Sequence, residues 1–436
     1  MNNEYVFYCD ANGVSEFPLT EQQKFMIIQD EKALENTGKK DGNTNLGNAF
    51  RISLPLSHKR LESSIQRVLD ENDALTMILM KKENTYFQKV VKNYKFKLDI
   101  IEAEGIDADE RFEYAVKNAT EFIGQDIDYY KEISIKFRLI KLDKSDYVFI
   151  YVVNHWIGDG MSFNLMIEQI FKYYMDLNAP REECASFIDF IKYENDFVAS
   201  ETGKKQLDYW KDELKEYKKI NLELAGKGVS ASAEDQFMQF ETKKLNKIAR
   251  KFKTSQFNVM LFVYHIILSD LLKTNDTIVG FSCANRLNKE FYKTIGYLSR
   301  AVQHRMIIND TDKLSDLLEI SKVKCNENLA NQQTSHYNDN SQFYISFQNF
   351  ISKKKQEESI LVPIKIPVKR VLDFFTMIVF EKSDELTLML NGDEDIFSSD
   401  FINSLKKYLY VVVDMLYENP EASVANVRNA YQETCK

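Results

Sequence analysis

The hydrophobic positions of the chain follow helical and strand periods in alternation. Residues 59–72 repeat apolar side chains at helical spacing, which predicts an amphipathic helix. Residues 133–142 alternate apolar and polar side chains, the period of a half-buried strand. After the turn DKSD, the run YVFIYVV at 147–153 is apolar throughout. Such a run predicts a strand that is covered on both faces.

The sequence predicts two helix N-termini in the first part of the chain. Thr20 can cap a helix, and Gln23 stands three residues later, where a capping box places its glutamine. A second helix is predicted after Gly160, because residues 163–174 carry apolar side chains with a 3.6-residue period. The stretch NHWIGDG at 154–160 is therefore a strand-to-helix junction, and such loops often carry catalytic groups.

The second half of the chain continues the mixture of helices and strands, so we expect an α/β (α+β) fold. Helices are predicted at 254–272 and 398–419. A single core stops growing near ~250–300 residues, so 436 residues predict two lobes. The loop at Asn178-Ala-Pro180 gives the boundary, with lobes at 1–178 and 179–436. The strand candidates of this half are 276–284, 341–350, 373–382 and 385–392.

Charge and cysteine content exclude several classes of protein. The net charge of −9 argues against a nucleic-acid binder and against an anionic membrane surface as the main partner. No secretory signal is visible, and no apolar run reaches the ~18–20 residues of a membrane span. The five cysteines are scattered without a CxxC pair. We therefore expect reduced thiols in a cytoplasmic protein.

His155 is the candidate for chemistry at the junction. Histidine can take a proton from an amine or alcohol near neutral pH, and a helix N-terminus offers backbone N–H groups to a developing oxyanion. The alternative is structural: Asp159 and Gly160 form a turn with a helix cap, and His155 is a bystander. The motif alone leaves both interpretations open.

The remaining histidines give weaker signals. His265 lies in an apolar helix and is expected in the core. His58, His304 and His336 have no acidic or cysteine partner at metal spacing, so no metal site is expected. The chain also lacks a GxSxG nucleophile elbow and the glycine-rich phosphate loops. On these residues alone, a binding module remains possible.

Several segments in order resemble one family. NHWIGDG is similar to the signature HHxxxDG, and FPLTEQQKFM and SFIDFIKY are similar to the segments that flank it. IVGFSCANRLNKE, TIGYLSRAVQHRM, FYISFQNF and LNGDEDIF follow in the family's order. Over about residues 16–430 the chain thus resembles the condensation domain of nonribosomal peptide synthetases, in the chloramphenicol acetyltransferase-like superfamily.

The resemblance implies a fold and a set of roles at the junction. The fold would be two acetyltransferase-like lobes set in a V as a pseudo-dimer, with a central tunnel. His155 matches the catalytic histidine, and the N–H of Gly160 would lie near the oxyanion. Asp159 would hold the loop by pairing with Arg286. Asn154 replaces the family's first histidine, and its amide can support the loop but cannot act as a base.

The resemblance also predicts residues of the tunnel. Trp156, Ser299, Arg300 and Asn349 are the candidates. Arg300, or Ser299 if the segment is displaced by one, stands where the family has an asparagine. At Arg300 a cationic group would thus replace a small amide, which predicts an unusual tunnel or substrate.

The implied activity is that of a free-standing condensation enzyme. An amine or hydroxyl would attack an acyl thioester on the phosphopantetheine arm of an acyl or peptidyl carrier protein, forming an amide or ester. No tightly bound cofactor is expected, and the expected oligomeric state is a monomer. One alternative is a coenzyme A-dependent acyltransferase that acts on a small alcohol or amine. The other is a degenerate condensation fold that recruits partners as a scaffold. The retained His155, Asp159 and Gly160 argue against a scaffold, whereas Asn154 argues for it.

Overall fold

Packing divides the protein, described here from a computed structural model, into two compact units that interleave along the sequence. The N-terminal unit contains Met1–Ser200, Ala284–Ser299 and Lys354–Arg370. The C-terminal unit contains Glu201–Cys283, Arg300–Lys353 and Val371–Lys436. The structure describes residues 8–10, 13–37, 44–83, 85–220, 236–335, 342–348, 360–366, 375–382, 385–391 and 397–435.

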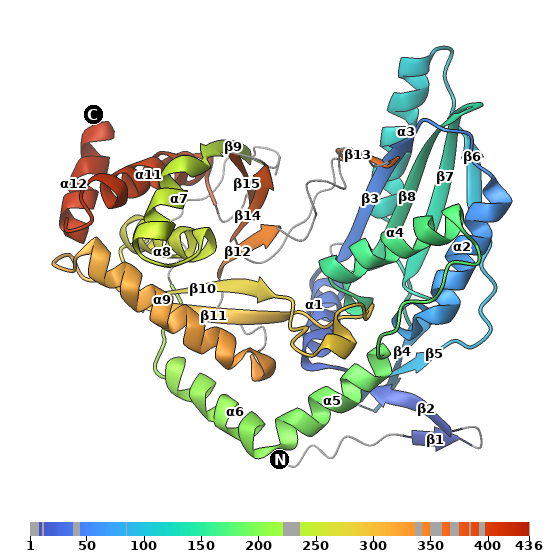
Figure 1. The fold of residues 1–436 in the computed structure, drawn as a ribbon, viewed down its shortest axis with the longest axis horizontal. Helices are drawn as coiled ribbons and strands as arrows, with labels where there is room; N and C mark the ends of the chain where they lie inside the picture. The colour runs from blue at the N-terminus through green and yellow to red at the C-terminus, as the bar shows by residue number, and fades with distance from the viewer. Residues whose placement is uncertain are drawn as a thin grey trace. The chain divides into compact units, whose positions relative to one another are not determined.

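The N-terminal unit builds two sheets and covers them with helices (Figure 1). A four-stranded sheet has the order β1-β2-β5-β4, and a five-stranded sheet has the order β13-β3-β8-β7-β6. The strands are β1 (Tyr8–Asp10), β2 (Gly13–Pro18), β3 (Asn45–Ile52), β4 (Met77–Lys82), β5 (Thr85–Val90), β6 (Asp99–Glu102), β7 (Ile135–Asp143), β8 (Asp146–Asn154) and β13 (Val362–Ile364). The helices are α1 (Glu21–Thr37), α2 (His58–Glu71), α3 (Ala108–Ile123), α4 (Gly160–Met175) and α5 (Phe187–Ala199), with short turns η1 (Asp73–Thr76), η2 (His155–Ile157) and η4 (Lys289–Phe291).

Strand β8 is the centre of the five-stranded sheet. It pairs antiparallel with β3 on one side and with β7 on the other. Its side chains alternate between two cores: Val148, Ile150 and Val152 pack with α3, while Phe149 and Val153 face the core that contains α2 and α4. The prediction of a strand covered on both faces is therefore confirmed.

The C-terminal unit contains a six-stranded sheet in the order β11-β10-β12-β14-β15-β9. The parallel pairs β10–β12 and β12–β14 lie inside the sheet, and the other pairs are antiparallel. The strands are β9 (Gln236–Glu241), β10 (Asp276–Cys283), β11 (Arg300–Ile307), β12 (Phe343–Gln348), β14 (Phe375–Lys382) and β15 (Glu385–Asn391). The helices are α6 (Glu201–Glu213), α7 (Thr242–Lys251), α8 (Gln256–Leu271), α9 (Leu314–Ala330), α11 (Ser399–Glu418) and α12 (Val424–Thr434), with the short turn η5 (Gln332–Thr334).

The division between the units falls at Ser200/Glu201, whereas the sequence suggested 178/179. Helix α5 lies beyond the proline loop and still packs in the N-terminal unit, because Phe187 and Phe190 are buried in its core. A proline loop therefore ends α4 without ending the unit. The interpretation of the two units as acetyltransferase-like lobes stays a prediction.

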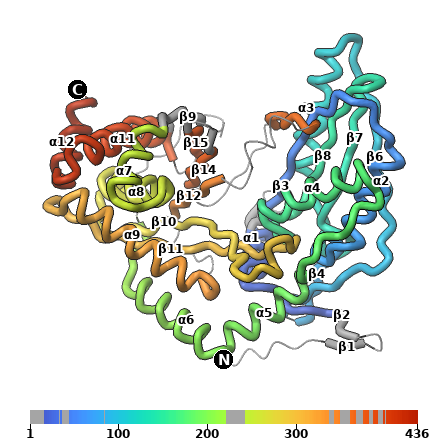
Figure 2. Tube along the Cα trace, in the orientation of Figure 1, coloured from blue at the N-terminus to red at the C-terminus, as the bar shows by residue number. Residues whose placement is uncertain are grey.

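The connection between β10 and β11 crosses from one unit to the other. These strands form an antiparallel pair in the C-terminal unit, but residues 284–299 between them pack in the N-terminal unit (Figure 2). Phe291 is buried there, and Gly296 lies so close to Phe187 that a Cβ atom at this glycine would stand 2.2 Å from the ring. A side chain at position 296 would therefore displace either the connection or helix α5.

No helix among the described residues is long and apolar enough to cross a membrane. Among the cysteines whose side chains the structure describes, Cys184, Cys325 and Cys435 are free thiols.

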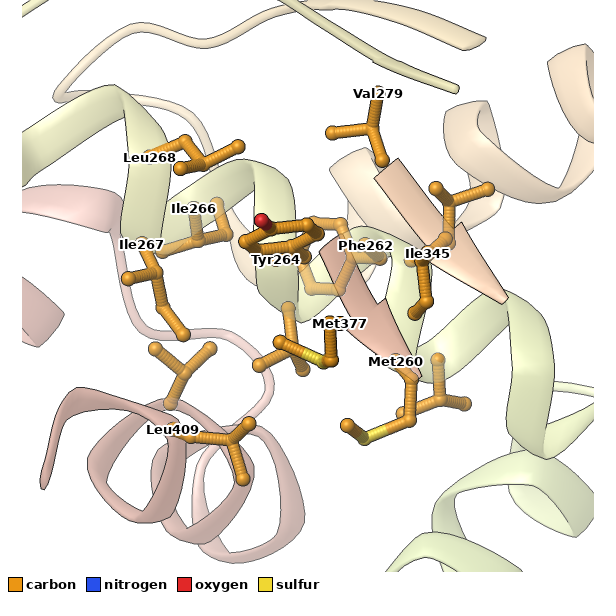
Figure 3. Packing of buried hydrophobic residues seen from close by; sticks show 14 of the residues in the cluster. Met260, Phe262, Tyr264, Ile266, Ile267, Leu268, Val279, Ile345, Met377 and Leu409 are labelled. Carbon is orange, nitrogen blue, oxygen red and sulfur yellow. The ribbon is translucent and has the colours of Figure 1, made fainter. Parts of the chain in front are cut away.

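The core of the C-terminal unit surrounds helix α8, which is buried along nearly its whole length. Tyr264 lies inside this core among Phe262, Val279 and Met377 (Figure 3). Its hydroxyl has no hydrogen-bond partner in the described part of the chain. A buried hydroxyl without a partner loses its water and gains nothing in return.

Two buried histidines form a chain of hydrogen bonds beside this core. The Ser321 carbonyl can only accept, so His304 Nε2 donates to it at 3.1 Å. In the neutral ring, His304 Nδ1 then accepts from His265 Nε2 at 3.0 Å. His265 Nδ1 therefore accepts from the Thr277 hydroxyl at 2.6 Å. One tautomer of each neutral ring satisfies the whole chain, and the core location expected for His265 is confirmed.

We predict that Tyr264→Phe leaves the free energy of unfolding unchanged or raises it by about 1 kcal/mol, because it removes a buried hydroxyl that has no described partner. Denaturant unfolding followed by circular dichroism measures this. Tyr408→Phe is the matched control: its hydroxyl donates to the Asp270 carboxylate at 3.0 Å, so its removal should cost about 1.5–3 kcal/mol. A loss at Tyr264 as large as that at Tyr408 would contradict the prediction.

We predict that the histidine pair weakens the fold as the pH falls below 6.5. Burial lowers the pKa of His304 to about 4 and that of His265 well below its ordinary value, so the folded protein binds fewer protons than the unfolded chain. The free energy of unfolding is therefore unaffected by the two histidines' titration above pH 6.5. Below pH 6.5 it falls by up to about 1.4 kcal/mol per pH unit for each histidine. Urea unfolding at pH 7.5, 6 and 5 should show a smaller pH slope in His265→Leu/His304→Leu. An equal slope in both proteins would show that the pair does not act in this way.

Candidate functional site

His155 is presented directly after the central strand β8. It begins η2, and its backbone N–H donates to the Thr44 carbonyl at 2.9 Å. The side chain is half-buried, and its ring lies against Tyr297 with 4.9 Å between ring centroids and 33° between ring planes. Backbone and ring are thus both held while part of the side chain stays accessible.

Tyr297 is a site residue that the sequence analysis missed. It belongs to residues 284–299, more than a hundred positions after His155, and it is buried. Aromatic pairs of this kind contribute about 0.5–1.5 kcal/mol beyond the area they bury, and they fix the orientation of a ring. The segment TIGYLSR was noted for its similarity to the family, but nothing local in it predicts a contact with His155.

Asp159 joins two elements of the N-terminal unit. One carboxylate oxygen caps α4 by accepting the Ser162 N–H at 2.8 Å. The other accepts the N–H groups of Leu298 and Ser299 at 3.1 and 2.9 Å. Arg286 donates to both oxygens at 3.1 Å, in a two-pronged ion pair. The pairing of Asp159 with Arg286 that we expected is thus present, and so is the helix cap.

Arg286 extends this cluster through its other N–H groups. Its guanidinium donates to the Ser162 hydroxyl at 2.8 Å and to the Thr294 carbonyl at 3.2 Å. The Ser162 hydroxyl in turn donates to the Gly296 carbonyl at 2.6 Å. The ion pair is nearly inaccessible to water, so Arg286 and Asp159 form a buried polar joint between α4 and residues 284–299.

The electrostatics of Asp159 exclude it as a base. Burial by itself would raise its pKa, but the Arg286 guanidinium and the N–H groups of Ser162 and Ser299 outweigh burial and hold the pKa below its ordinary value. The carboxylate therefore stays ionised, and its lone pairs accept hydrogen bonds from α4, from Arg286 and from the backbone at 298 and 299. A role in proton transfer for His155, the other titratable residue of NHWIGDG, stays a prediction.

Gly160 is the first residue of α4 and is exposed. The N–H groups in the first turn of a helix have no acceptor within the helix and lie at the positive end of its dipole. Gly160 therefore stands where a developing negative charge would be stabilised. Its role as oxyanion donor stays a prediction.

Asn154 supports the loop through both ends of its amide. The side chain is buried, and its oxygen accepts the Trp156 N–H at 3.2 Å. Its nitrogen donates to the Thr44 hydroxyl at 2.8 Å and reaches Asp30 Oδ2 at 3.3 Å. These contacts agree with the expectation that the Asn154 amide supports the loop.

Gln23 is a second residue whose link to the site the sequence analysis missed. The predicted capping box is confirmed: Gln23 N–H donates to Thr20 Oγ1 at 3.2 Å, and Thr20 N–H donates to Gln23 Oε1 at 3.0 Å. The Gln23 side chain also donates to the Trp156 carbonyl at 3.1 Å and to the side chain of Gln88 at 2.9 Å. The start of α1 thus contacts the turn that carries His155.

The assignment of Trp156 to a substrate tunnel is wrong. Its side chain is fully buried in the core of the N-terminal unit, near Tyr129. The indole N–H donates to the Ser134 hydroxyl at 2.8 Å. The residue that follows His155 therefore anchors the turn in the core.

The other tunnel candidates fall in three places. Ser299 is half-buried and contacts Asp159 through its backbone N–H. Arg300 begins β11 and is buried in the C-terminal unit. Asn349 lies outside the described residues. A role for these three residues in a tunnel stays a prediction, as does the tunnel itself.

No group of three or more histidine, cysteine, aspartate or glutamate side chains in the described part of the chain could hold a metal ion.

Comparison with known proteins gives a family match over most of the chain. The family model described as "Condensation domain" matches residues 37–434. Gramicidin S synthase 2 of Brevibacillus brevis is 22% identical over 448 residues, which take in 96% of this chain and 10% of that protein. Surfactin synthase subunit 3 of Bacillus subtilis (strain 168) is 22% identical over 87% of this chain and 31% of its own length. The chain thus spans about a tenth to a third of these relatives.

Solved structures share the fold. A four-domain nonribosomal peptide synthetase bound to AMP and glycine has a TM-score of 0.78 at 17% identity, over 98% of this chain and 34% of that one. The X-domain from teicoplanin biosynthesis has a TM-score of 0.77 at 14% identity, over 94% of this chain and 96% of that one. The predicted mixed α/β fold of the condensation-domain type is therefore confirmed.

We predict that Arg286→Met lowers the free energy of unfolding by about 3–5 kcal/mol, because it leaves the Asp159 carboxylate buried without its counter-charge. The lowered pKa of Asp159 means that its contribution is present above the ordinary aspartate pKa and is lost as the pH falls through the folded value. Denaturant unfolding at pH 7 of Arg286→Met, Asp159→Asn and the double variant checks this. The double variant should lose less than the sum of the single losses, whereas additive losses would show that the two groups do not act as a pair.

Proposed function

Because the chain belongs to the condensation-domain family, we propose that it transfers an acyl group from a thioester to an amine, with His155 as the proton acceptor. Condensation domains of nonribosomal peptide synthetases form amide bonds, which is an acyl transfer. The observation that carries the proposal is the division of roles inside NHWIGDG. The Asp159 carboxylate is engaged by its ion pair with Arg286 and by three backbone N–H donors, whereas His155 is half-exposed and directly follows β8, five residues before α4 begins.

The proposed reaction assigns one task to each group. The amine nitrogen attacks the thioester carbonyl carbon, and His155 accepts a proton from the amine. The carbonyl oxygen gains negative charge, which the N–H of Gly160 and the positive end of α4 stabilise. The carbon–sulfur bond then breaks, and the proton passes to the sulfur as it leaves as a thiol. Asp159 keeps the loop in place and takes no proton.

We propose that the thioester is carried on the phosphopantetheine arm of a carrier protein and that the chain acts as a free-standing monomer in the cytoplasm. The match to synthetases, in which carriers present the substrate, supports the carrier as partner. The nucleophile can be an amine or a hydroxyl, since a histidine base serves both. No tightly bound cofactor is required, because the thioester itself is the activated substrate.

Experiments can distinguish two other functions from the proposed one. A coenzyme A-dependent acyltransferase would use the same histidine and the same helix terminus, so the site favours neither donor. A scaffold without activity would not need an accessible histidine held against an aromatic ring.

We predict that His155→Ala lowers amide formation by about 10²–10⁴-fold, the range that general base catalysis supplies, while loss of the ring contact with Tyr297 lowers the free energy of unfolding by only about 0.5–1.5 kcal/mol. Intact-protein mass spectrometry of loaded carriers, with added amines, measures the product. His58→Ala is a matched control: His58 is also half-buried and lies edge-on to Tyr147 at 5.6 Å between ring centroids. His58→Ala should retain full activity. Product formation that survives His155→Ala would refute the base assignment, and equal turnover of acyl coenzyme A would favour the alternative donor.

A further inference from the structure

Three elements of the N-terminal unit meet at the Asn154 amide. Asp30 comes from α1, Thr44 precedes β3, and Asn154 ends β8. The Thr44 hydroxyl donates to Asp30 Oδ2 at 2.9 Å, and Asn154 Nδ2 donates to the Thr44 hydroxyl at 2.8 Å. Asn154 Nδ2 also lies 3.3 Å from the same carboxylate oxygen. The three side chains close a small ring of hydrogen bonds.

Each group in this ring has one possible role. The Trp156 N–H can only donate, so the amide oxygen of Asn154 must face it. The ionised carboxylate of Asp30 can only accept, so the amide nitrogen must face that side. The Thr44 hydroxyl gives its proton to the carboxylate and accepts from the amide. The Trp156 N–H on one side and the Asp30 carboxylate on the other therefore favour the same direction of the Asn154 amide.

The same residues hold the backbone of His155. The Thr44 carbonyl accepts the His155 N–H at 2.9 Å, while the Asn154 oxygen caps the turn in which His155 is the first residue. His155 is thus bonded to Thr44 and follows Asn154 directly. The Asn154–Thr44 contact is therefore adjacent to both points at which the backbone of His155 is held.

We propose that Asp30 is a positioning residue for the reaction, which acts through Thr44 and Asn154 to fix the direction of the His155 imidazole. This inference rests on the proposed function of His155 as the base. It also gives a physical role to the amide of Asn154. Asp30 on α1 needs a donor at this position, and the Trp156 N–H in η2 needs an acceptor. An aspartate at that position would place a second carboxylate against Asp30.

An exchange of amide and carboxylate tests the pairing, because asparagine and aspartate have nearly the same shape. Asn154→Asp opposes two carboxylates across the Thr44 hydroxyl, and we expect kcat to fall by up to about 10²-fold, the cost of a misplaced catalytic group, with a smaller change in KM. Asp30→Asn alone should lower kcat to a lesser degree, since an amide oxygen can still accept from Thr44. The double variant Asn154→Asp/Asp30→Asn restores one donor and one acceptor, and kcat should recover most of the loss.

The position of His155 can be read without turnover. The imidazole carbon and nitrogen resonances of His155, assigned by their loss in His155→Ala, should shift in Asn154→Asp and return toward the wild-type positions in the double variant. Asp109→Asn makes the same chemical change at an exposed position of α3 and should alter neither kcat nor these resonances. If Asn154→Asp does not fold, Thr44→Val removes the central hydroxyl and should shift the same resonances.

The outcomes separate this inference from the proposed function. Unchanged His155 resonances in Asn154→Asp and Thr44→Val would overturn the positioning role, whatever the activity. A double variant no better than Asn154→Asp would overturn the pairing with Asp30. If wild-type protein turns over no thioester, the proposed function fails, and recovery of the resonances in the double variant still decides whether Asp30 positions His155.

Discussion

The buried charge of Asp159 is the constraint on which the N-terminal unit depends. A carboxylate removed from water is costly unless it is fully paired, and Asp159 is paired by a two-pronged guanidinium and by backbone N–H groups from two segments. These donors come from the first turn of α4 and from residues 284–299, so the charge is tolerated only when both are in place. The ion pair thereby requires a connection from the second half of the chain to lie in the first unit.

The loop between β8 and α4 is held at both ends by different chemistry. At its start, Asn154 joins the end of β8 to α1 and to the residue before β3 through neutral and charged hydrogen bonds. At its end, Asp159 caps α4 and binds Arg286. Between these ends Trp156 fills the core, and His155 is the titratable side chain of the loop that keeps access to solvent. The loop thus holds the backbone of His155 at both ends while part of its side chain stays accessible.

Local patterns in the sequence predicted what depends on local chemistry. The two-sided burial of β8, the helix after Gly160 and the capping box at Thr20 follow from residue periods and side-chain types within a few positions. The family resemblance added Arg286 as the partner of Asp159, a pairing across more than a hundred residues that periodicity does not predict. The described residues do not test the predicted tunnel, and one of its candidate residues, Asn349, lies outside them.

The failures have physical causes as well. Trp156 was misplaced because the family resemblance assigns a position in the motif but not the direction of its side chain, which the 3₁₀ turn η2 places in the core. Tyr297 and the Gln23–Trp156 contact were missed because each joins elements that are distant in sequence and carries no local signal. The helix end near Pro180 suggested a boundary between the two units. Helix α5 nevertheless belongs to the N-terminal unit, because its aromatic side chains are buried in the core of that unit.

The interleaved path of the chain also sets an order of assembly during synthesis. While the ribosome is still adding residues before Ala284, the nascent N-terminal unit lacks Arg286, Tyr297 and the glycine that fits against Phe187. At that stage Asp159, the N-cap of α4, has no counter-charge, and burial of its carboxylate would be costly. Domains usually fold in turn as they emerge. The first unit can therefore bury Asp159 with its counter-charge only after β10 of the second unit has been synthesised.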